Sequence, residues 1–227
     1  MKTVVRCMEA TFSPGQLEDI ADLSTEKQRL WRHRGILRPQ VRGRAQFTAH
    51  ELAGIVTLRY LELSPGGDLK ALAVHANRVG AFVLGLALAD PNAWIVQGFV
   101  ETREAFEGFL KRKVEREGLC SIARALGLAK EEFGRFYVHS VAGWKITDDL
   151  PSAFESSNWA ACVVIDLHAM SKLLVASVVK HSETPLYWVD AGSEDTDERA
   201  TEPNTHWKKV VMRNVKSREP ARQRAKR

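Results

Sequence analysis

Four polar side chains on one predicted helix are of the types that read DNA bases. They are Thr25, Gln28, Arg29 and Arg32. Leu30 and Trp31 are expected to pack inward, which leaves these four facing out. An arginine can donate two hydrogen bonds to a guanine edge, and a glutamine amide pairs with adenine in a similar way. The pattern therefore predicts a short helix that enters the major groove of duplex DNA.

Arginines in the segment that follows are of the type that binds phosphate. Arg38, Arg42 and Arg44 lie in or beside a turn at 39–44. Guanidinium groups pair well with phosphate oxygens, so this segment is predicted to be a wing that holds the DNA backbone beside the groove. For the predicted helix, a solvated polar face without nucleic acid is the alternative.

The residues around these two segments predict the elements that position them. Pro14 suits the first turn of a first helix, and Ser24 is a good N-cap for the helix that carries the four polar side chains. Gly35 is a typical stop for that helix. Thr48 then caps a third helix, which runs to Leu63 with apolar residues at three- and four-residue steps. The predicted order is helix, turn, helix, wing and helix.

Two motifs in this segment are similar to those of a known family of bacterial regulators. The family's run of Ser, Arg-Tyr-Tyr and Gly-Leu-Leu is matched by Ser24, Arg29-Leu30-Trp31 and Gly35-Ile36-Leu37. Its wing ends in Gly-Tyr-Arg-x-Tyr, where this chain has Gly43-Arg44-Ala45-Gln46-Phe47. Residues 12–75 therefore resemble the winged-helix DNA-binding domain of the MerR family.

The resemblance implies a recognition helix in the major groove, a wing on the backbone and a homodimer on a two-fold site. Leu30 stands where the family often has an aromatic that touches DNA. Ala45 stands at the position of the wing arginine, whose role would pass to Arg42 or Arg44. Excisionases of mobile elements share this type of winged helix, so an accessory DNA-bending factor stays open beside a transcription regulator.

The distribution of charge also favours a polyanionic partner. The net charge of the 227-residue chain is +5, but residues 24–47 carry +6 and residues 206–227 carry +8, which leaves −9 for the rest. Two basic patches on an acidic body are typical of nucleic-acid binding.

Sequence motifs for catalysis and metal binding are missing. The chain has no phosphate loop, no glycine-rich dinucleotide motif and no Gly-x-Ser-x-Gly elbow. The cysteines Cys7, Cys120 and Cys162 are dispersed, and Cys162, in an apolar run, is expected to be buried. Asp166 with His168 is one candidate acid/base pair. We expect a protein that is not an enzyme and that holds no cofactor and no metal.

Residues 76–190 predict a helical linker followed by a second, small α+β domain that serves as an effector or interaction module. Residues 68–89 are apolar, and their face is either a subunit interface or an internal core. This face consists of Leu72, Val79, Val83 and Leu86. An amphipathic helix is predicted at 101–117. Residues 119–133 predict two short helices around a glycine turn, which are either packed without nucleic acid or a second DNA-reading helix-turn-helix, and their acidic second helix favours the former.

The later part of this body changes to strand patterns. Strands are predicted at 136–141, at 160–167 as a central strand and at 185–190, with a helix at 168–180. Aromatic residues of this part either line a pocket for an effector of unknown identity or fill a core. They are Trp144, Trp159, Tyr187 and Trp188.

Residues 191–227 begin acidic and end basic, and their low apolar content predicts a disordered tail. The tail is either a second, non-specific contact to DNA or a solubilising segment. No signal peptide is expected in Met1 to Ala10, and the apolar run Val79 to Ala89 is shorter than the about 20 residues that span a bilayer. We expect a cytoplasmic, nucleoid-associated protein that does not contact a membrane.

The sequence thus predicts an α+β protein with three parts. A winged helix-turn-helix at 12–75 precedes a small α+β domain at 76–190 and the tail at 191–227. The protein is predicted to be a homodimeric transcription regulator that binds double-stranded DNA in a sequence-specific way. The alternatives are an excisionase-like or phage accessory factor and a winged-helix module that docks on RNA polymerase.

Overall fold

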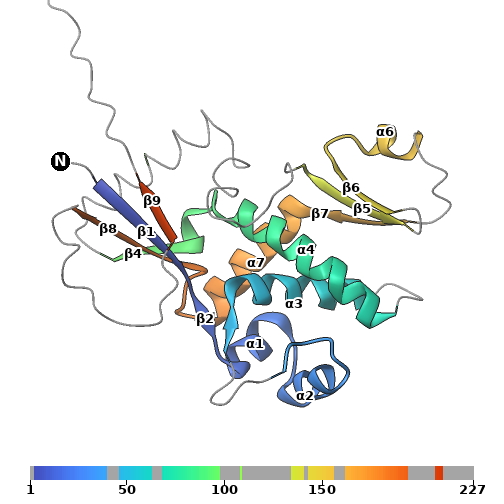
Figure 1. Cartoon of the computed structure of the whole chain (residues 1–227), viewed down its shortest axis with the longest axis horizontal. Coiled ribbons are helices and arrows are strands. Elements are labelled where there is room, and N and C mark those ends of the chain that lie inside the picture. The colour runs from blue at the N-terminus through green and yellow to red at the C-terminus, as the bar shows by residue number, and fades with distance from the viewer. Residues whose placement is uncertain are drawn as a thin grey trace, which may run out of the picture.

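The chain is an α+β protein built from helices and small separate sheets. The computed structural model describes residues 3–39, 46–62, 68–97, 108, 134–140, 143–155, 162–193 and 208–211. Helices cross in the middle of the molecule, a four-stranded sheet lies at one end, and a three-stranded sheet lies at the other (Figure 1). The helices predicted at 101–117 and within 119–133 lie outside the described residues, apart from residue 108.

The helices of the N-terminal part follow the predicted order. They are α1 (Pro14–Ala21), α2 (Thr25–His33), α3 (Ala49–Glu62) and α4 (Leu69–Ala87). Thr48 and Glu51 cap the start of α3 reciprocally, because each backbone N–H donates to the other's side chain. The short strands β2 (Thr11–Phe12) and β3 (Phe47–Thr48) pair in antiparallel fashion. The predicted cap at Thr48 is confirmed.

The four-stranded sheet joins both ends of the described chain. Its strands are β1 (Thr3–Glu9), β4 (Trp94–Gln97), β8 (Tyr187–Ser193) and β9 (Lys208–Val211), in the order β4-β8-β1-β9. β1 is antiparallel to β8 and β9, and β4 is parallel to β8. The predicted strand at 185–190 is confirmed as β8. Residues 208–211 were expected to be disordered, and this is wrong, because they pair with β1.

The three-stranded sheet carries the later strands of the predicted second body. It contains β5 (Phe136–Ser140), β6 (Gly143–Thr147) and β7 (Cys162–Asp166), all antiparallel, in the order β6-β5-β7. The segment at 160–167 was predicted to be a central strand, but β7 is an edge strand and β5 is central. Cys162 is accordingly half-buried rather than buried. The short helix α6 (Leu150–Glu155) lies between β6 and β7 in the chain.

A close helix crossing forms the centre of the core. α4 packs on α3 and on α7 (Leu167–His181), and the crossing of α3 and α4 brings Gly54 and Gly80 into backbone contact. A Cβ atom at Gly80 would lie 2.5 Å from the Gly54 nitrogen, so glycine is needed there. Val79, Val83 and Leu86 are buried within the chain, which makes this face of α4 part of the internal core.

Residues on both sides of the predicted boundary at 75/76 share this core. α7 packs against α1, and the Gln16 amide donates to Ser182 Oγ at 3.0 Å and to Thr184 Oγ1 at 3.1 Å. The backbone of Leu186 accepts from Ala10 at 3.0 Å. The described part of 76–190 therefore buttresses the N-terminal helices directly.

One helix among the described residues, α4, is long and apolar enough to cross a membrane by length and composition. More than half of its apolar window is buried in the core, and core helices of soluble proteins pass the same test. The observation is therefore weak evidence for a membrane span.

Candidate nucleic-acid interface

Local capping sets the geometry of α1, the turn and α2. Ser13 caps α1 in a reciprocal pair with Gln16, and Ser24 Oγ accepts from the Lys27 N–H at the start of α2. Asp22 turns the chain in the left-handed region, at φ 49°. Leu23, fully buried in the turn, anchors it to the core. Serine and aspartate at these positions suit caps and turns because their short side chains replace backbone partners.

Gln28 faces the inside of the protein, so the prediction that it reads a base is wrong. Its side chain is fully buried, and Nε2 donates to the carbonyls of Pro14 and Leu23, both at 2.8 Å. These bonds fasten α2 to the start of α1 and to the turn. The signal in the sequence was its spacing, because Gln28 is three residues before the buried Trp31.

The outward face of α2 is formed instead by Glu26, Arg29, Leu30 and His33. Leu30 was expected to pack inward and is instead 44% exposed. Trp31 is buried, as predicted. Arg29 is exposed, as predicted, and it lies one helical turn from His33. This face combines a carboxylate, a guanidinium, an apolar side chain and an imidazole.

Thr25 is exposed at the start of α2, but its hydroxyl is engaged. Oγ1 donates to Glu18 Oε2 at 3.1 Å, and the Thr25 backbone N–H is 3.3 Å from the same oxygen. A carboxylate thus lies at the positive end of α2, where it is favourable to the helix. The same carboxylate would repel a phosphate at this point.

Arg32 connects α2 to the predicted wing. Its guanidinium lies over the Phe47 ring, 5.3 Å from the centroid, and the side chain is half-buried. Burial and the neighbouring Arg29 lower the pKa of Arg32. The buried Nη2 has no hydrogen-bond partner among the described residues. Arg32 and Arg29 together therefore form a local positive site.

Arg38 closes the base of the wing segment. Nη2 donates to the Gln46 carbonyl at 2.9 Å, and Nε lies 2.6 Å from Glu51 Oε1. The side chain is 58% exposed. Arg42 and Arg44, the other predicted phosphate contacts, lie outside the described residues.

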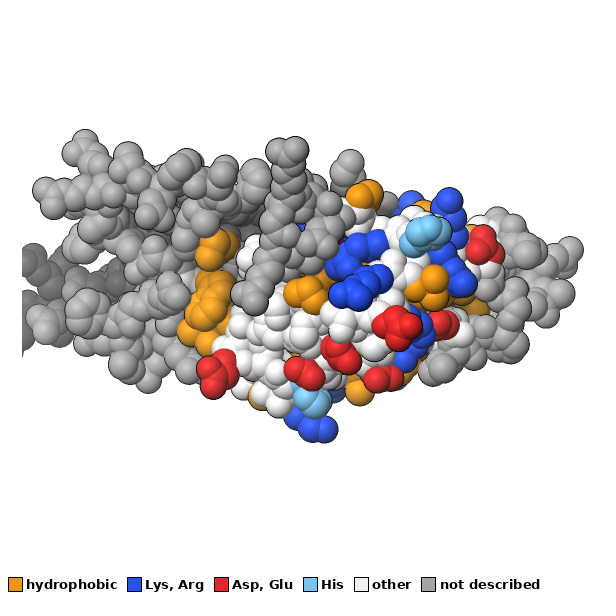
Figure 2. All heavy atoms as spheres, turned by 90° about the horizontal axis from the view of Figure 1, so that it is seen from below, with side chains coloured by type: hydrophobic (Ala, Val, Ile, Leu, Met, Phe, Trp, Pro, Cys, Tyr) orange, Lys and Arg blue, Asp and Glu red, His pale blue; other side chains and the backbone are white. Residues whose placement is uncertain are grey.

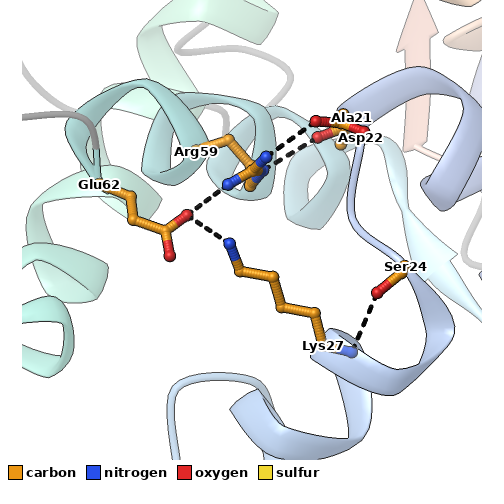
Figure 3. A network of polar contacts seen from close by, with 6 residues as sticks. All are labelled: Ala21, Asp22, Ser24, Lys27, Arg59 and Glu62. Atoms are coloured by element: carbon orange, nitrogen blue, oxygen red, sulfur yellow. Dashed lines mark hydrogen bonds and ion pairs between the residues drawn. The ribbon is translucent and has the colours of Figure 1, made fainter.

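A network of ion pairs braces α2 against α3 (Figure 3). Lys27 Nζ lies 2.7 Å from Glu62 Oε2, which also pairs with Arg59, and Arg59 Nη2 lies 2.9 Å from Asp22 Oδ2. Burial by itself raises the pKa of Glu62, but the hydrogen bonds from Lys27 and Arg59 outweigh it and lower the pKa. Lys27 therefore serves the orientation of α2.

The charge on this side of the molecule is mixed. Figure 2 shows Lys and Arg side chains gathered in one area with Asp and Glu side chains bordering it. Glu18, Asp19 and Asp22 of α1 and the turn are exposed. The cations are consequently concentrated toward the C-terminal half of α2 and the base of the wing, where Arg29, Arg32, Arg34 and Arg38 lie.

In the candidate acid/base pair of Asp166 and His168, the Asp166 carboxylate is engaged in structural contacts. Asp166 caps α7 by accepting from the Ala169 N–H at 2.9 Å, and Arg135 Nη2 donates to its other oxygen at 3.0 Å. Burial alone raises the pKa of Asp166, but these hydrogen bonds outweigh it and lower the pKa. His168 is exposed on the first turn of the helix. Within the described ranges, no three potential metal ligands gather.

The aromatic residues of the second body that the structure describes lie in two different sheets. Trp144, in β6, stacks with Tyr137 at 5.9 Å and carries Arg78 over its ring at 4.3 Å. Tyr187 and Trp188 lie in β8 of the other sheet, where Tyr187 is buried. Trp159 lies outside the described residues.

Comparison with known proteins gives no relative: no family model, no curated protein and no solved structure matches the chain. The structure by itself defines an α+β protein in which the short helix α2 is fixed by contacts to α1 and α3 and exposes Arg29.

Proposed function

We propose that this protein is a sequence-specific, double-stranded DNA-binding transcription regulator of the MerR-like winged-helix type. In this proposal α2 enters the major groove and the segment between α2 and β3 lies on the backbone. Arg29 and Arg32 read base edges, while Arg38, joined by Arg42 and Arg44, holds phosphates. The protein works as a homodimer on a two-fold site.

One observation carries the proposal: α2 exposes Arg29 on its outer face, while residues on its inner face bond to α1, to the turn and to α3. Gln28 ties the helix to α1, and Lys27 ties it to Glu62 of α3. A helix that is fixed by contacts on its inner face keeps its outer side chains in a defined orientation, as base readout requires. The antiparallel β2–β3 pair at the base of the following loop supports the wing assignment.

The direct test is selection from random duplex DNA by the purified protein at near-physiological salt. Wild type should enrich a two-fold symmetric motif. Arg29→Ala should relax the preference at one position per half-site, at a cost of about 1–3 kcal/mol. Lys172→Ala removes an exposed cation of α7 and is the matched control, so its motif should equal that of wild type. An equal loss on all sequences for Arg29→Ala would count against the groove assignment.

A second candidate is a winged-helix module that docks on RNA polymerase or another protein. The exposed carboxylates of Glu18, Asp19 and Asp22 beside α2 favour it, because they repel phosphates and attract a basic protein surface. This candidate predicts no enriched motif and equal, weak DNA binding by wild type and Arg29→Ala. Tandem rather than palindromic sites, with bent DNA, would indicate an accessory recombination factor.

A further inference from the structure

A pocket of about 460 Å³ lies at the base of the predicted wing, next to α3 and α4. Its volume falls in the range of about 300–1,000 Å³ that is usual for small-molecule sites. Part of its wall is apolar and is formed by Ile36, Leu37, Phe47 and Ile55. This pocket belongs neither to the outward face of α2 nor to the aromatic residues of the second body.

The polar part of the wall has an excess of negative charge. Glu9, at the end of β1, and Glu51, in the first turn of α3, both line the pocket. Among the described lining residues, Arg38 carries the one guanidinium and His50 the one imidazole. Arg38 pairs with Glu51, whereas Glu9 forms no ion pair with another described residue. A half-buried carboxylate beside apolar walls is complementary to a cation with an apolar body.

The ion pair in the pocket is of a kind that a ligand can replace. The Glu51 side chain is 26% exposed and is held by the Thr48 N–H, which donates to Oε2 at 2.8 Å. The Arg38 side chain is 58% exposed, and ion pairs with such an exposed partner contribute little to stability. Glu51 is therefore the more fixed partner, and Arg38, whose other contact is the Gln46 carbonyl at 2.9 Å, is the more exposed one.

We propose that this pocket binds a small organic ammonium ion, with its charge between Glu9 and Glu51 and its apolar part against Phe47 and Ile55. The ammonium takes the place of Arg38 at Glu51. The guanidinium of Arg38, released from the pocket, turns outward at the base of the wing. For its effect on DNA this inference rests on the proposed function, in which Arg38 holds a phosphate, and release from Glu51 makes its guanidinium free for that contact.

The binding step is tested by calorimetric titration of the full chain without DNA. The probes are 2-phenylethylammonium, cyclohexylmethylammonium and, as matched isosteres, 2-phenylethanol and 3-phenylpropionate. At least one ammonium should bind saturably, and the neutral and anionic isosteres should bind about tenfold more weakly or not at all. Glu9→Gln should weaken the binding of the ammonium about tenfold. Glu183→Gln, an exposed carboxylate between α7 and β8, should leave it unchanged.

Several results overturn the site. One is the absence of saturable binding by both ammonium probes up to about 10 mM. Another is equal affinity of the protein for the three phenyl probes. The third is an unaltered affinity of Glu9→Gln for the ammonium when the variant unfolds thermally like wild type. Glu9→Gln tests the pocket without touching the reciprocal cap of Glu51 and Thr48, so the variant is expected to fold.

The coupling to DNA is measured separately, by salt titration of DNA affinity with and without the bound ammonium. Release of Arg38 should tighten DNA binding and steepen the slope of log affinity against log salt concentration by about one unit. Arg38→Gln should abolish both changes. Ammonium binding with unchanged DNA affinity would overturn the release of Arg38 and leave the site. Ammonium binding by a protein with no DNA affinity would overturn the proposed function instead.

Discussion

The guanidinium of Arg32 lies 5.3 Å from the centre of the Phe47 ring, and this contact joins the exposed helix α2 to the strand that ends the predicted wing. Phe47 is itself buried and is paired with Phe12 in the β2–β3 ladder. The orientation of α2 and that of β3 are thereby linked through one side-chain pair.

This pair gives a prediction for stability that separates Arg32 from Arg29. A double-mutant cycle of Arg32→Ala and Phe47→Leu should give a coupling energy of about 0.5–1 kcal/mol, because a cation over an aromatic ring contributes that amount. Chemical denaturation of the four proteins measures it. Arg29→Ala, on the exposed face, should show no coupling to Phe47→Leu, and equal coupling for both arginines would contradict the contact.

Gln28→Ala should lower the free energy of unfolding by about 2–4 kcal/mol. The substitution leaves a cavity and removes both hydrogen bonds that the buried amide makes to Pro14 and Leu23. Urea unfolding followed by tryptophan fluorescence measures the change, since Trp31 is buried close by in the same helix. Arg29→Ala on the opposite face is the control, with an expected change within about 0.5 kcal/mol. A loss as small as the control's would mean that Gln28 faces solvent.

Alanine substitutions at two helical glycines should have opposite signs. Gly80→Ala should destabilise by about 1–3 kcal/mol, because its Cβ would meet the backbone of Gly54 at the crossing of α3 and α4. Gly15→Ala should stabilise by about 0.4–1 kcal/mol, because the nearest atom to its Cβ would be 4.0 Å away and alanine restricts the unfolded chain. Thermal unfolding of both variants tests the pair, and a tolerated Gly80→Ala would argue against the close crossing.

Stability should fall when the solution is acidified through the titration range of histidine. His75, on α4, and His139, on β5, are in ring contact with centroids 3.9 Å apart, and His75 Nδ1 is 3.0 Å from the Tyr137 hydroxyl. Burial, His139 and Arg78 lower the pKa of His75, and burial lowers the pKa of His139. Burial also raises the pKa of Tyr137 to about 12, so the phenol stays neutral throughout.

The sign follows from the lowered pKa values. Below about pH 6.5, the ordinary value for histidine, the unfolded chain binds protons that the folded protein resists. The contribution of this pair is therefore fully present above that pH and is lost as the pH falls through the folded pKa values. Denaturant unfolding between pH 5 and pH 8, about one and a half units to either side of the ordinary value, measures it. His139→Gln should flatten the profile, and His168→Gln, which is exposed, should not. An unchanged profile in His139→Gln would contradict the interpretation.

Local chemistry made much of the N-terminal part predictable. Ser24 and Thr48 cap helices because their side chains bond to N–H groups only three residues away, and this arrangement depends little on the rest of the chain. Periodic apolar residues predicted α7 for a similar reason, since one face of a helix is buried whatever covers it. The exposure of Arg29 also followed from this periodicity.

Contacts between distant segments decided what the sequence alone did not. Gln28 is buried because the carbonyls of Pro14 and Leu23 meet its amide only after α1 folds against α2. Lys208–Val211 is a strand because β1, almost two hundred residues earlier in the chain, offers its free edge. The pairing of Arg38 with Glu51 at a pocket likewise depends on how the base of the wing lies against α3. Composition and spacing report which side chains can bond, and the free energy of a bond is gained only where the fold brings its partners within reach.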